Sequence, residues 1–208
     1  MPAPQSSPVH SRLHEGRPVL GHVNLMVDTL IVNANIDDLR AIVRATLASS
    51  PPAMAGTFTA AARTRLLQTN AVLPPHPGNL FGTRADGSIV PTPELRAALV
   101  RARALYGAGL GLASLKVLAL VVRATKGHRW EESGEMENTF SDIDADISQA
   151  LQSTREELDG GRVADMTKAR ETLRELRASI QESQQEVKSW GGSFPFERAA
   201  ATLEFWKL

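Results

Sequence analysis

The amino-acid sequence predicts an all-α fold, a helical bundle with a long antiparallel, coiled-coil-like helical hairpin in its C-terminal half. The first observation is a heptad-like apolar pattern that extends from Met136 to Trp190. The second is an Asp-Gly-Gly break at residues 159–161, which is typical of a short loop between two antiparallel helices. The third is the almost wholly apolar segment 105–122, which suits the centre of a bundle.

Composition divides the chain into three parts. Residues 1–21 are rich in Pro and Ser and hold no apolar stretch of signal-peptide length, so we expect a disordered N-terminal arm. Residues 22–130 are expected to form a helical bundle with a Pro-rich loop at 71–93. Residues 131–208 are expected to form an acidic helical hairpin followed by a short aromatic C-terminal helix.

Length and residue content limit the class of protein. The 208 residues are 42% hydrophobic, which is enough for a sizeable core and argues against a fully disordered chain. The chain has no cysteine, which excludes disulfides, thiolate metal sites and cysteine nucleophiles. A cysteine-free chain of this kind fits an intracellular protein, cytoplasmic or nuclear.

Three helices are predicted at the start of the bundle. Helical spacing begins near Val23. Asn35 is a good N-cap for the second helix, because Asp37 and Asp38 follow in the first turn, where carboxylates complement the helix dipole. The third helix is predicted over about 52–69. We expect buried apolar stripes in both, formed by Ile36, Leu39, Ile42, Val43 and Leu47 in the second helix and by Met54, Phe58, Ala62, Leu66 and Leu67 in the third.

The Pro-rich loop leads into a further helix. Prolines prevent a continuous helix within the loop, although Asp86-Gly87 allows a small β-turn or hairpin. Thr92 is a good helix start, because a proline and a glutamate follow its capping hydroxyl. We expect this helix to continue to about Thr125.

Segment 105–122, inside that helix, has three interpretations. It can be a buried central helix, a helix inserted in or docked on a membrane, or a helix kinked at its glycines. Gly107 and Gly111 form a small-residue pair that lets a neighbouring helix approach closely. Lys116 opposes membrane insertion, because an ammonium group near the bilayer centre costs roughly 2.5–3.5 kcal/mol. We therefore favour the buried central helix.

The C-terminal hairpin is predicted to have one apolar seam along each arm. Ile147 and Ile180 occupy central positions of the two seams and are expected to pack against other helices. Gly191 and the residues after it end the second arm. A short last helix is expected from about Pro195 to Lys207, docked on the bundle by its aromatic side chains.

The net charge of zero hides a strong asymmetry. Residues 1–130 hold 14 basic and 6 acidic side chains, a difference of +8, whereas residues 131–160 hold 1 basic and 10 acidic, a difference of −9. An acidic helix next to a basic half predicts either a solvated face, or screening of basic groups in the same chain, or attraction of a basic partner. The candidate interaction residues on this helix are Asp142, Asp144, Asp146, Glu156 and Glu157.

No motif in the sequence predicts catalysis, a cofactor or a metal site. The GAGLG stretch has no strand before it and lies inside a helical pattern, so it is not a nucleotide-binding loop. The alternating aspartates from Asp142 to Asp146 lack the glycine and glutamate of a calcium loop. The histidines have no acidic or nucleophilic companion at a recognisable spacing.

These observations favour a non-catalytic helical interaction or scaffold protein that engages a protein partner, or a second copy of itself, through the hairpin. The first alternative is a membrane-associated protein that inserts or docks residues 105–122. The second is a nucleic-acid adaptor, because arginines such as Arg40 and Arg44 recur at helical spacing in the basic half.

Overall fold

The computed structural model describes residues 25–69, 79–85, 87–130 and 134–206. The predicted N-terminal arm and most of the prolines of the Pro-rich loop lie outside these residues. The chain forms two compact units, Met1–Pro51 and Pro52–Leu208. The division therefore falls before the third predicted helix, whereas composition suggested a boundary between residues 130 and 131.

The described part of the first unit consists of helices α1 (Leu25–Asn33) and α2 (Ile36–Ser49). Asn35 caps α2, because its side-chain oxygen accepts a 2.8 Å hydrogen bond from the backbone N–H of Asp38. The predicted burial of the α2 stripe is wrong: α2 has no buried side chain, and Ile36 is 60% exposed. Two short helices do not by themselves provide the additional layer that a hydrophobic core requires, and they are the only helices of this unit within the described residues.

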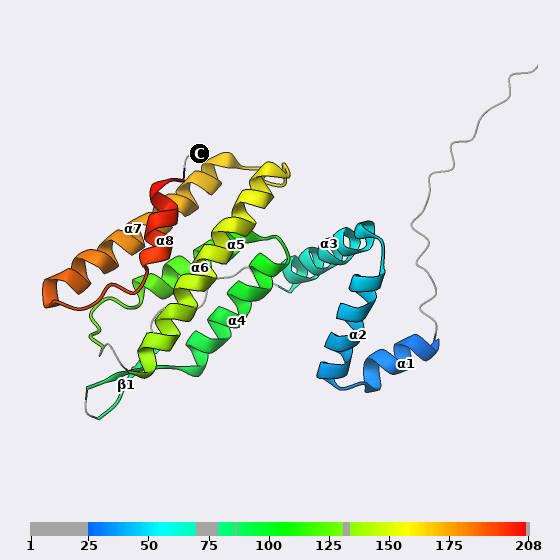
Figure 1. Ribbon diagram of the computed structural model, residues 1–208, viewed down its shortest axis with the longest axis horizontal. Coiled ribbons are helices and arrows are strands. Elements are labelled where there is room, and N and C mark those ends of the chain that lie inside the picture. The colour runs from blue at the N-terminus through cyan, green and yellow to red at the C-terminus, as the bar shows by residue number, and fades with distance from the viewer. Residues whose placement is uncertain (1–24, 70–78, 86, 131–133, 207–208) are drawn as a thin grey trace, which may run out of the picture. The chain divides into compact units, whose positions relative to one another are not determined.

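The second unit contains six helices and a two-stranded sheet within its described residues (Figure 1). In chain order they are α3 (Pro52–Gln68), β1 (Phe81–Thr83), β2 (Ile89–Pro91), α4 (Pro93–Gly107), α5 (Gly111–Arg123), α6 (Glu135–Asp159), α7 (Met166–Trp190) and α8 (Glu197–Glu204). Helix α3 also has no buried side chain. Met54, Phe58 and Leu67 are exposed, so the burial predicted for its stripe is wrong as well.

The single helix predicted from Thr92 to about Thr125 is wrong, because a turn at residues 108–110 separates α4 from α5. Gly109 in this turn has a φ of 75°, in the left-handed region that glycine adopts at little cost. Segment 105–122 therefore combines two of its three interpretations: its helix is interrupted at the glycines, and the segment is buried in protein. The break lets α4 and α5 pack against each other.

Helix α5 lies at the centre of the second unit and packs against α4, α6 and α7 (Figure 1). Leu115, Leu118 and Val122 are among its fully buried side chains, whereas Lys116 faces solvent. A helix that neighbours surround needs an apolar surface almost all round, which explains the composition of this segment. Within the described chain, no helix has the length and apolar character needed to cross a membrane.

The two arms of the predicted hairpin are α6 and α7, and their seam residues Ile147 and Ile180 are buried. The main packing partner of both arms is α5, which contacts α6 and α7 extensively. The coiled-coil interpretation, in which the arms bury their seams against each other, is therefore not confirmed. The predicted seam residues are buried, but they pack mainly against α5 rather than against each other.

Helix α8 closes the bundle by lying across α6 and α7 (Figure 1). Arg177 of α7 donates a 2.8 Å hydrogen bond to the carbonyl of Leu203 near the C-terminal end of α8. Phe196, just before α8, is fully buried and meets Phe140 of α6 edge-on, with ring centroids 5.8 Å apart. These contacts dock the aromatic tail on the bundle.

Strands β1 and β2 form an antiparallel hairpin in which Gly82 lies opposite Val90. This is the hairpin that the Asp86-Gly87 pair predicted, although Asp86 itself is outside the described residues. Leu80 and Ile89 anchor the hairpin in the main hydrophobic core.

Candidate functional site

Asp146 of α6, whose side chain is buried, forms an ion pair with Arg103 of α4, whose side chain is exposed. Both carboxylate oxygens accept hydrogen bonds of 3.0 Å from Arg103 Nε, and Arg103 Nη2 lies 2.9 Å from Oδ2. The hydroxyl of Tyr106 donates a further 3.0 Å hydrogen bond to Asp146. The bond to Asp146 raises the pKa of Arg103, and burial, aided by the negative charge of Asp146, raises the pKa of Tyr106 to about 12. This cluster joins α6 to α4.

Asp144 of α6 caps a different helix, α8. Its carboxylate accepts hydrogen bonds from the backbone N–H groups of Ala199, at 2.9 Å, and Arg198, at 3.4 Å. These are orphan N–H groups of the first turn, and Phe196 at the N-cap position provides no side-chain acceptor. Burial raises the pKa of Asp144, while the two N–H groups and the guanidinium of Arg198 act in the opposite direction. The carboxylate therefore replaces a local cap.

Glu157 plays the same role for α5. Its Oε2 accepts a 3.0 Å hydrogen bond from the backbone N–H of Leu112, in the first turn of α5, where Leu110 provides no side-chain cap. Burial raises the pKa of the Glu157 carboxyl, and the Leu112 N–H and the charge of Arg162 oppose this shift. Two helices of the bundle thus receive their N-terminal caps from α6.

The structure separates the five acidic residues predicted for interaction. Asp144, Asp146 and Glu157 are buried and paired within the chain, so their interpretation as a solvated face is wrong. The reason lies in contacts with distant segments: α5 and α8 begin without side-chain caps of their own, and Asp146 pairs with Arg103 of α4. Asp142 and Glu156 are exposed, and Asp142 lies 3.6 Å from Arg103.

The two glycines predicted as a packing pair lie in different surroundings. Gly111, the first residue of α5, is buried, and a Cβ atom placed on it would lie 2.6 Å from the Cα of Thr154 in α6. Gly107, the last residue of α4, is exposed and has open space where a Cβ would lie. Close helix approach therefore depends on Gly111.

The cap on α5 leads to a prediction for Glu157→Gln. Because the folded pKa of Glu157 is raised above the unfolded value, the folded state binds more protons. Its contribution to the free energy of unfolding is therefore largest below the unfolded pKa and declines as pH rises through the folded pKa. Glutamine keeps an acceptor for Leu112 without a buried charge. We expect Glu157→Gln to unfold at the same or higher denaturant concentration at pH 7 and to lose this decline in stability, which begins as pH rises above the ordinary pKa of a glutamate carboxyl.

Glu157→Ala is the matched variant, because it removes the acceptor as well as the charge. We expect it to lower the free energy of unfolding by about 1–2 kcal/mol at pH 7, the typical cost of losing an N-cap. Equal stability of the Gln and Ala variants would show that the carboxylate does not cap α5. Urea unfolding followed by circular dichroism measures the free energy of unfolding of the wild type and of both variants.

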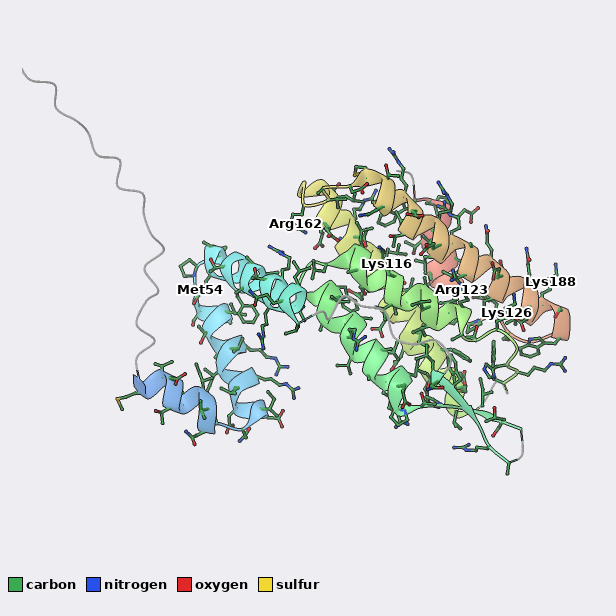
Figure 2. All side chains as sticks on the ribbon, turned by 180° about the vertical axis from the view of Figure 1, so that it is seen from behind. Met54, Lys116, Arg123, Lys126, Arg162 and Lys188 are labelled. Carbon is green, nitrogen blue, oxygen red and sulfur yellow. The ribbon has the colours of Figure 1, made fainter. Side chains whose placement is uncertain are left out.

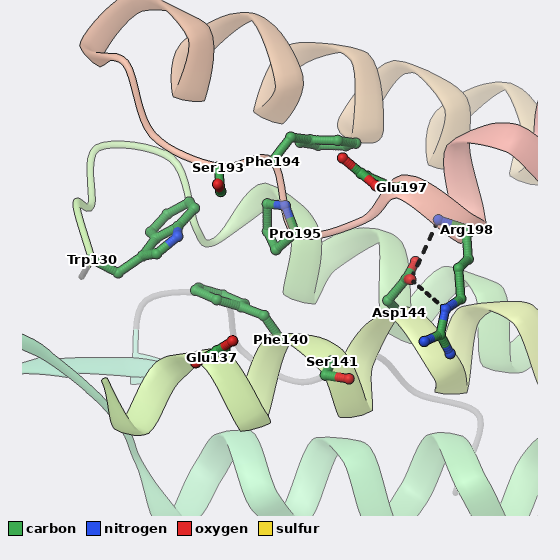
Figure 3. A pocket seen from close by; sticks show the side chains of 10 residues that line it. All are labelled: Trp130, Glu137, Phe140, Ser141, Asp144, Ser193, Phe194, Pro195, Glu197 and Arg198. Atoms are coloured by element: carbon green, nitrogen blue, oxygen red, sulfur yellow. Dashed lines mark hydrogen bonds and ion pairs between the residues drawn. The ribbon is translucent and has the colours of Figure 1, made fainter. Parts of the chain in front are cut away.

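A cavity of about 520 Å³ lies between α6 and the segment that joins α7 to α8 (Figure 3). Trp130 and Phe140 line one end, and Phe194 and Pro195 line the opposite wall. The ring of Trp130 is held between Phe140 and Trp190, with centroid distances of 4.6 and 5.2 Å. The wall is therefore aromatic and firmly packed.

Acidic side chains complete the cavity. Glu137 of α6 and Glu197 of α8 line it and are exposed, and the capping carboxylate of Asp144 lies deeper, between α6 and α8 (Figure 3). Arg198 also lines the cavity, but its guanidinium is mostly exposed and lies 4.0 Å from Asp144. Among the described residues, the lining contains serine hydroxyls but no histidine or lysine that could activate them.

Basic side chains gather on the far side of the bundle. Figure 2 shows Lys116, Arg123 and Lys126 along α5 and the turn after it, with Lys188 on α7 nearby. Acidic groups of α7 interrupt this surface: Lys126 lies 3.9 Å from Glu182. This negative charge lowers the positive potential that would attract phosphate groups there.

Sequence reasoning missed the cavity and the roles of Asp144 and Glu157. A signal for the caps exists only once the starts of α5 and α8 are known, because Leu110 and Phe196 are poor N-cap residues and predict an acceptor from elsewhere in the chain. The cavity could not be predicted from the sequence, because its walls come from segments far apart in the chain. Comparison with known protein families, curated proteins and solved structures gave no match.

Proposed function

We propose that this protein is a non-catalytic helical interaction module that binds the helical face of another protein chain through α1 and α2. The observation that carries the proposal is the large number of exposed apolar side chains on these helices. Large apolar side chains exposed on them are Met26, Val27, Leu30, Ile31, Val32, Ile36 and Ile42. So many exposed apolar side chains within one short segment are typical of a binding surface.

The pattern of α2 favours a helical partner. Leu39, Val43 and Leu47 recur every four residues along the helix and are only half-buried, with Ile36 exposed one turn before them. Such a stripe fits the groove between ridges of another helix, and packing there would remove its apolar surface from water. Arg44, beside the stripe, has no ion-pair partner within the described residues and is available to an acidic group of the partner.

The acidic hairpin has less support as the binding surface. Asp144, Asp146 and Glu157 already neutralise helix ends and Arg103 in the same chain. Exposed pairs formed by the remaining Asp142 and Glu156 would contribute only roughly 0–1 kcal/mol each. Insertion of segment 105–122 into a membrane would require α5 to leave the core, and no observation favours it. The interrupted basic surface likewise gives little support to nucleic-acid binding.

The proposal predicts the effect of making the N-terminal helices polar. A variant with Leu30→Ser, Ile31→Ser, Ile36→Ser and Ile42→Ser should bind its partner at least about tenfold more weakly, because burial of apolar area drives the association. The melting temperature of the second unit should not change, since none of these residues belongs to its core. Cross-linking in native extracts and light scattering of the purified protein measure binding to other chains and to itself.

Two control variants make the test selective. Val100→Ser with Phe205→Ser removes exposed apolar side chains of the second unit and should leave binding unchanged. Asp142→Asn with Glu156→Gln removes the two exposed carboxylates among the five candidate interaction residues of α6. If only the variant with Asp142→Asn and Glu156→Gln lost binding, the binding site would lie on the hairpin instead of on α1 and α2. A wild-type chain that stays monomeric and cross-links to no protein would contradict the proposal.

A further inference from the structure

We infer that the cavity between α6 and the α7–α8 connection binds a small organic cation that carries a quaternary or primary ammonium group. The inference concerns a small ligand and is independent of the helical surface of α1 and α2. It is carried by the combination of an aromatic wall, two exposed carboxylates and a volume of about 520 Å³, which falls in the usual range of ligand sites.

The aromatic wall provides the first requirement. A cation is attracted to the face of a tryptophan or phenylalanine ring within about 6 Å of the ring centre. Trp130 and Phe194 are half-buried rings that line the cavity, whereas Phe140 also lines it but is only 1% exposed and supports Trp130 (Figure 3). Because Trp130 is packed against both Phe140 and Trp190, the wall does not have to be ordered when a ligand enters.

The charges provide the second requirement. Glu137, Asp144 and Glu197 contribute three negative charges to the lining and Arg198 one positive charge, a sum of −2. The carboxylate of Asp144 is occupied by the N–H groups of α8, and Arg198 lies beside it. Glu137 and Glu197 are therefore the groups left to face a ligand, from the first turns of two different helices.

Two other cavities in the described part of the chain do not share this combination. The cavity beside α8 that Arg155, Asp159 and Trp206 line has balanced charges, and the cavity lined by Arg63, Arg162 and Glu156 has a lining charge of +1. An anion in the acidic cavity would face two uncompensated carboxylates. A bare metal ion would need three converging ligands, and no such group of His, Asp or Glu side chains occurs in the described chain.

Choline and its neutral isostere 3,3-dimethyl-1-butanol provide a sharp test, because they have the same shape and differ by one charge. Isothermal titration of the full chain should show choline binding and at least tenfold weaker binding of the isostere. Saturation-transfer NMR should show contact between the trimethylammonium group and aromatic protons. The double variant Glu137→Gln, Glu197→Gln should weaken choline binding by about tenfold, and both residues are exposed, so the fold should persist.

Glu204→Gln is the matched control, since this exposed carboxylate belongs to α8 but does not line the cavity. It should bind choline as the wild type does. Equal binding of choline and the isostere would mean an apolar hollow without charge selection and would overturn the inference. Absence of choline binding, or binding that the double variant leaves unchanged, would overturn it as well.

Discussion

Replacing Ile147 by Asp should unfold the second unit or lower its free energy of unfolding by roughly 4 kcal/mol or more. The Ile147 side chain is 0% exposed and belongs to the main hydrophobic core. An aspartate there would bury a carboxylate without a counter-charge and would leave a cavity where the isoleucine packed. Since whole domains are stable by only about 5–15 kcal/mol, thermal unfolding followed by circular dichroism should show a large fall in melting temperature or no transition.

Gln149→Asp is the control for this prediction. It adds the same charge two residues away on α6, at an exposed position, and should change stability by less than about 0.5 kcal/mol. Ile180→Asp should repeat the loss on α7, where the side chain is 3% exposed. If Ile147→Asp melted like Gln149→Asp, the assignment of Ile147 to the core would be wrong.

Apolar periodicity predicted the arms α6 and α7 well because helix geometry alone determines which side chains share a face. Ile147 and Ile180 were placed in the seams on this basis, and both are buried. Capping chemistry predicted the starts of α2 and α4 for the same reason: Asn35 and Thr92 act on N–H groups only three residues away. Local rules therefore gave most of the helices.

The packing partners could not be derived in the same way. An apolar seam in the sequence predicts that one side of a helix is buried, but it does not show which element covers that side. For this reason α7 was paired with α6, although its main contact is α5. The break between α4 and α5 was one of three interpretations but was not favoured, because α-helical spacing continues across residues 108–110, where Gly109 has a left-handed φ in the structure. In α2 and α3 the error concerned burial itself, because their apolar stripes were expected to be buried and are not.

The roles of the charged residues in the candidate sites could not be predicted from local sequence either. From sequence, Asp142, Asp144 and Asp146 are three similar carboxylates at alternate positions. In the structure, Asp144 caps α8, Asp146 pairs with Arg103, and Asp142 is exposed. Burial and pairing depend on elements 40 or more residues away, as with Arg103 and Asp146 or Asp144 and Ala199, so no local pattern separates the three roles.

Gly111→Ala should be strongly destabilising, whereas Gly107→Ala should be neutral or slightly stabilising. A Cβ on Gly111 would lie 2.6 Å from the Cα of Thr154, which is rigid backbone of α6 and cannot rotate away as a side chain can. Helices α5 and α6 would have to separate, which stretches the hydrogen bond from Leu112 to Glu157 as well. We expect a loss of about 3 kcal/mol, at the upper end of overpacking effects, measured by urea unfolding.

Gly107 gives this comparison its internal control. It has a helical conformation at the end of α4, and no neighbouring atom lies within 4 Å of the position that a Cβ would occupy. Alanine lowers the entropy of the unfolded chain relative to glycine, so Gly107→Ala should raise the free energy of unfolding by up to about 1 kcal/mol. The two substitutions are chemically identical and lie four residues apart, so their opposite signs isolate the contact between α5 and α6. Similar effects in both variants would mean that α5 and α6 do not approach as closely at Gly111 as the structure places them.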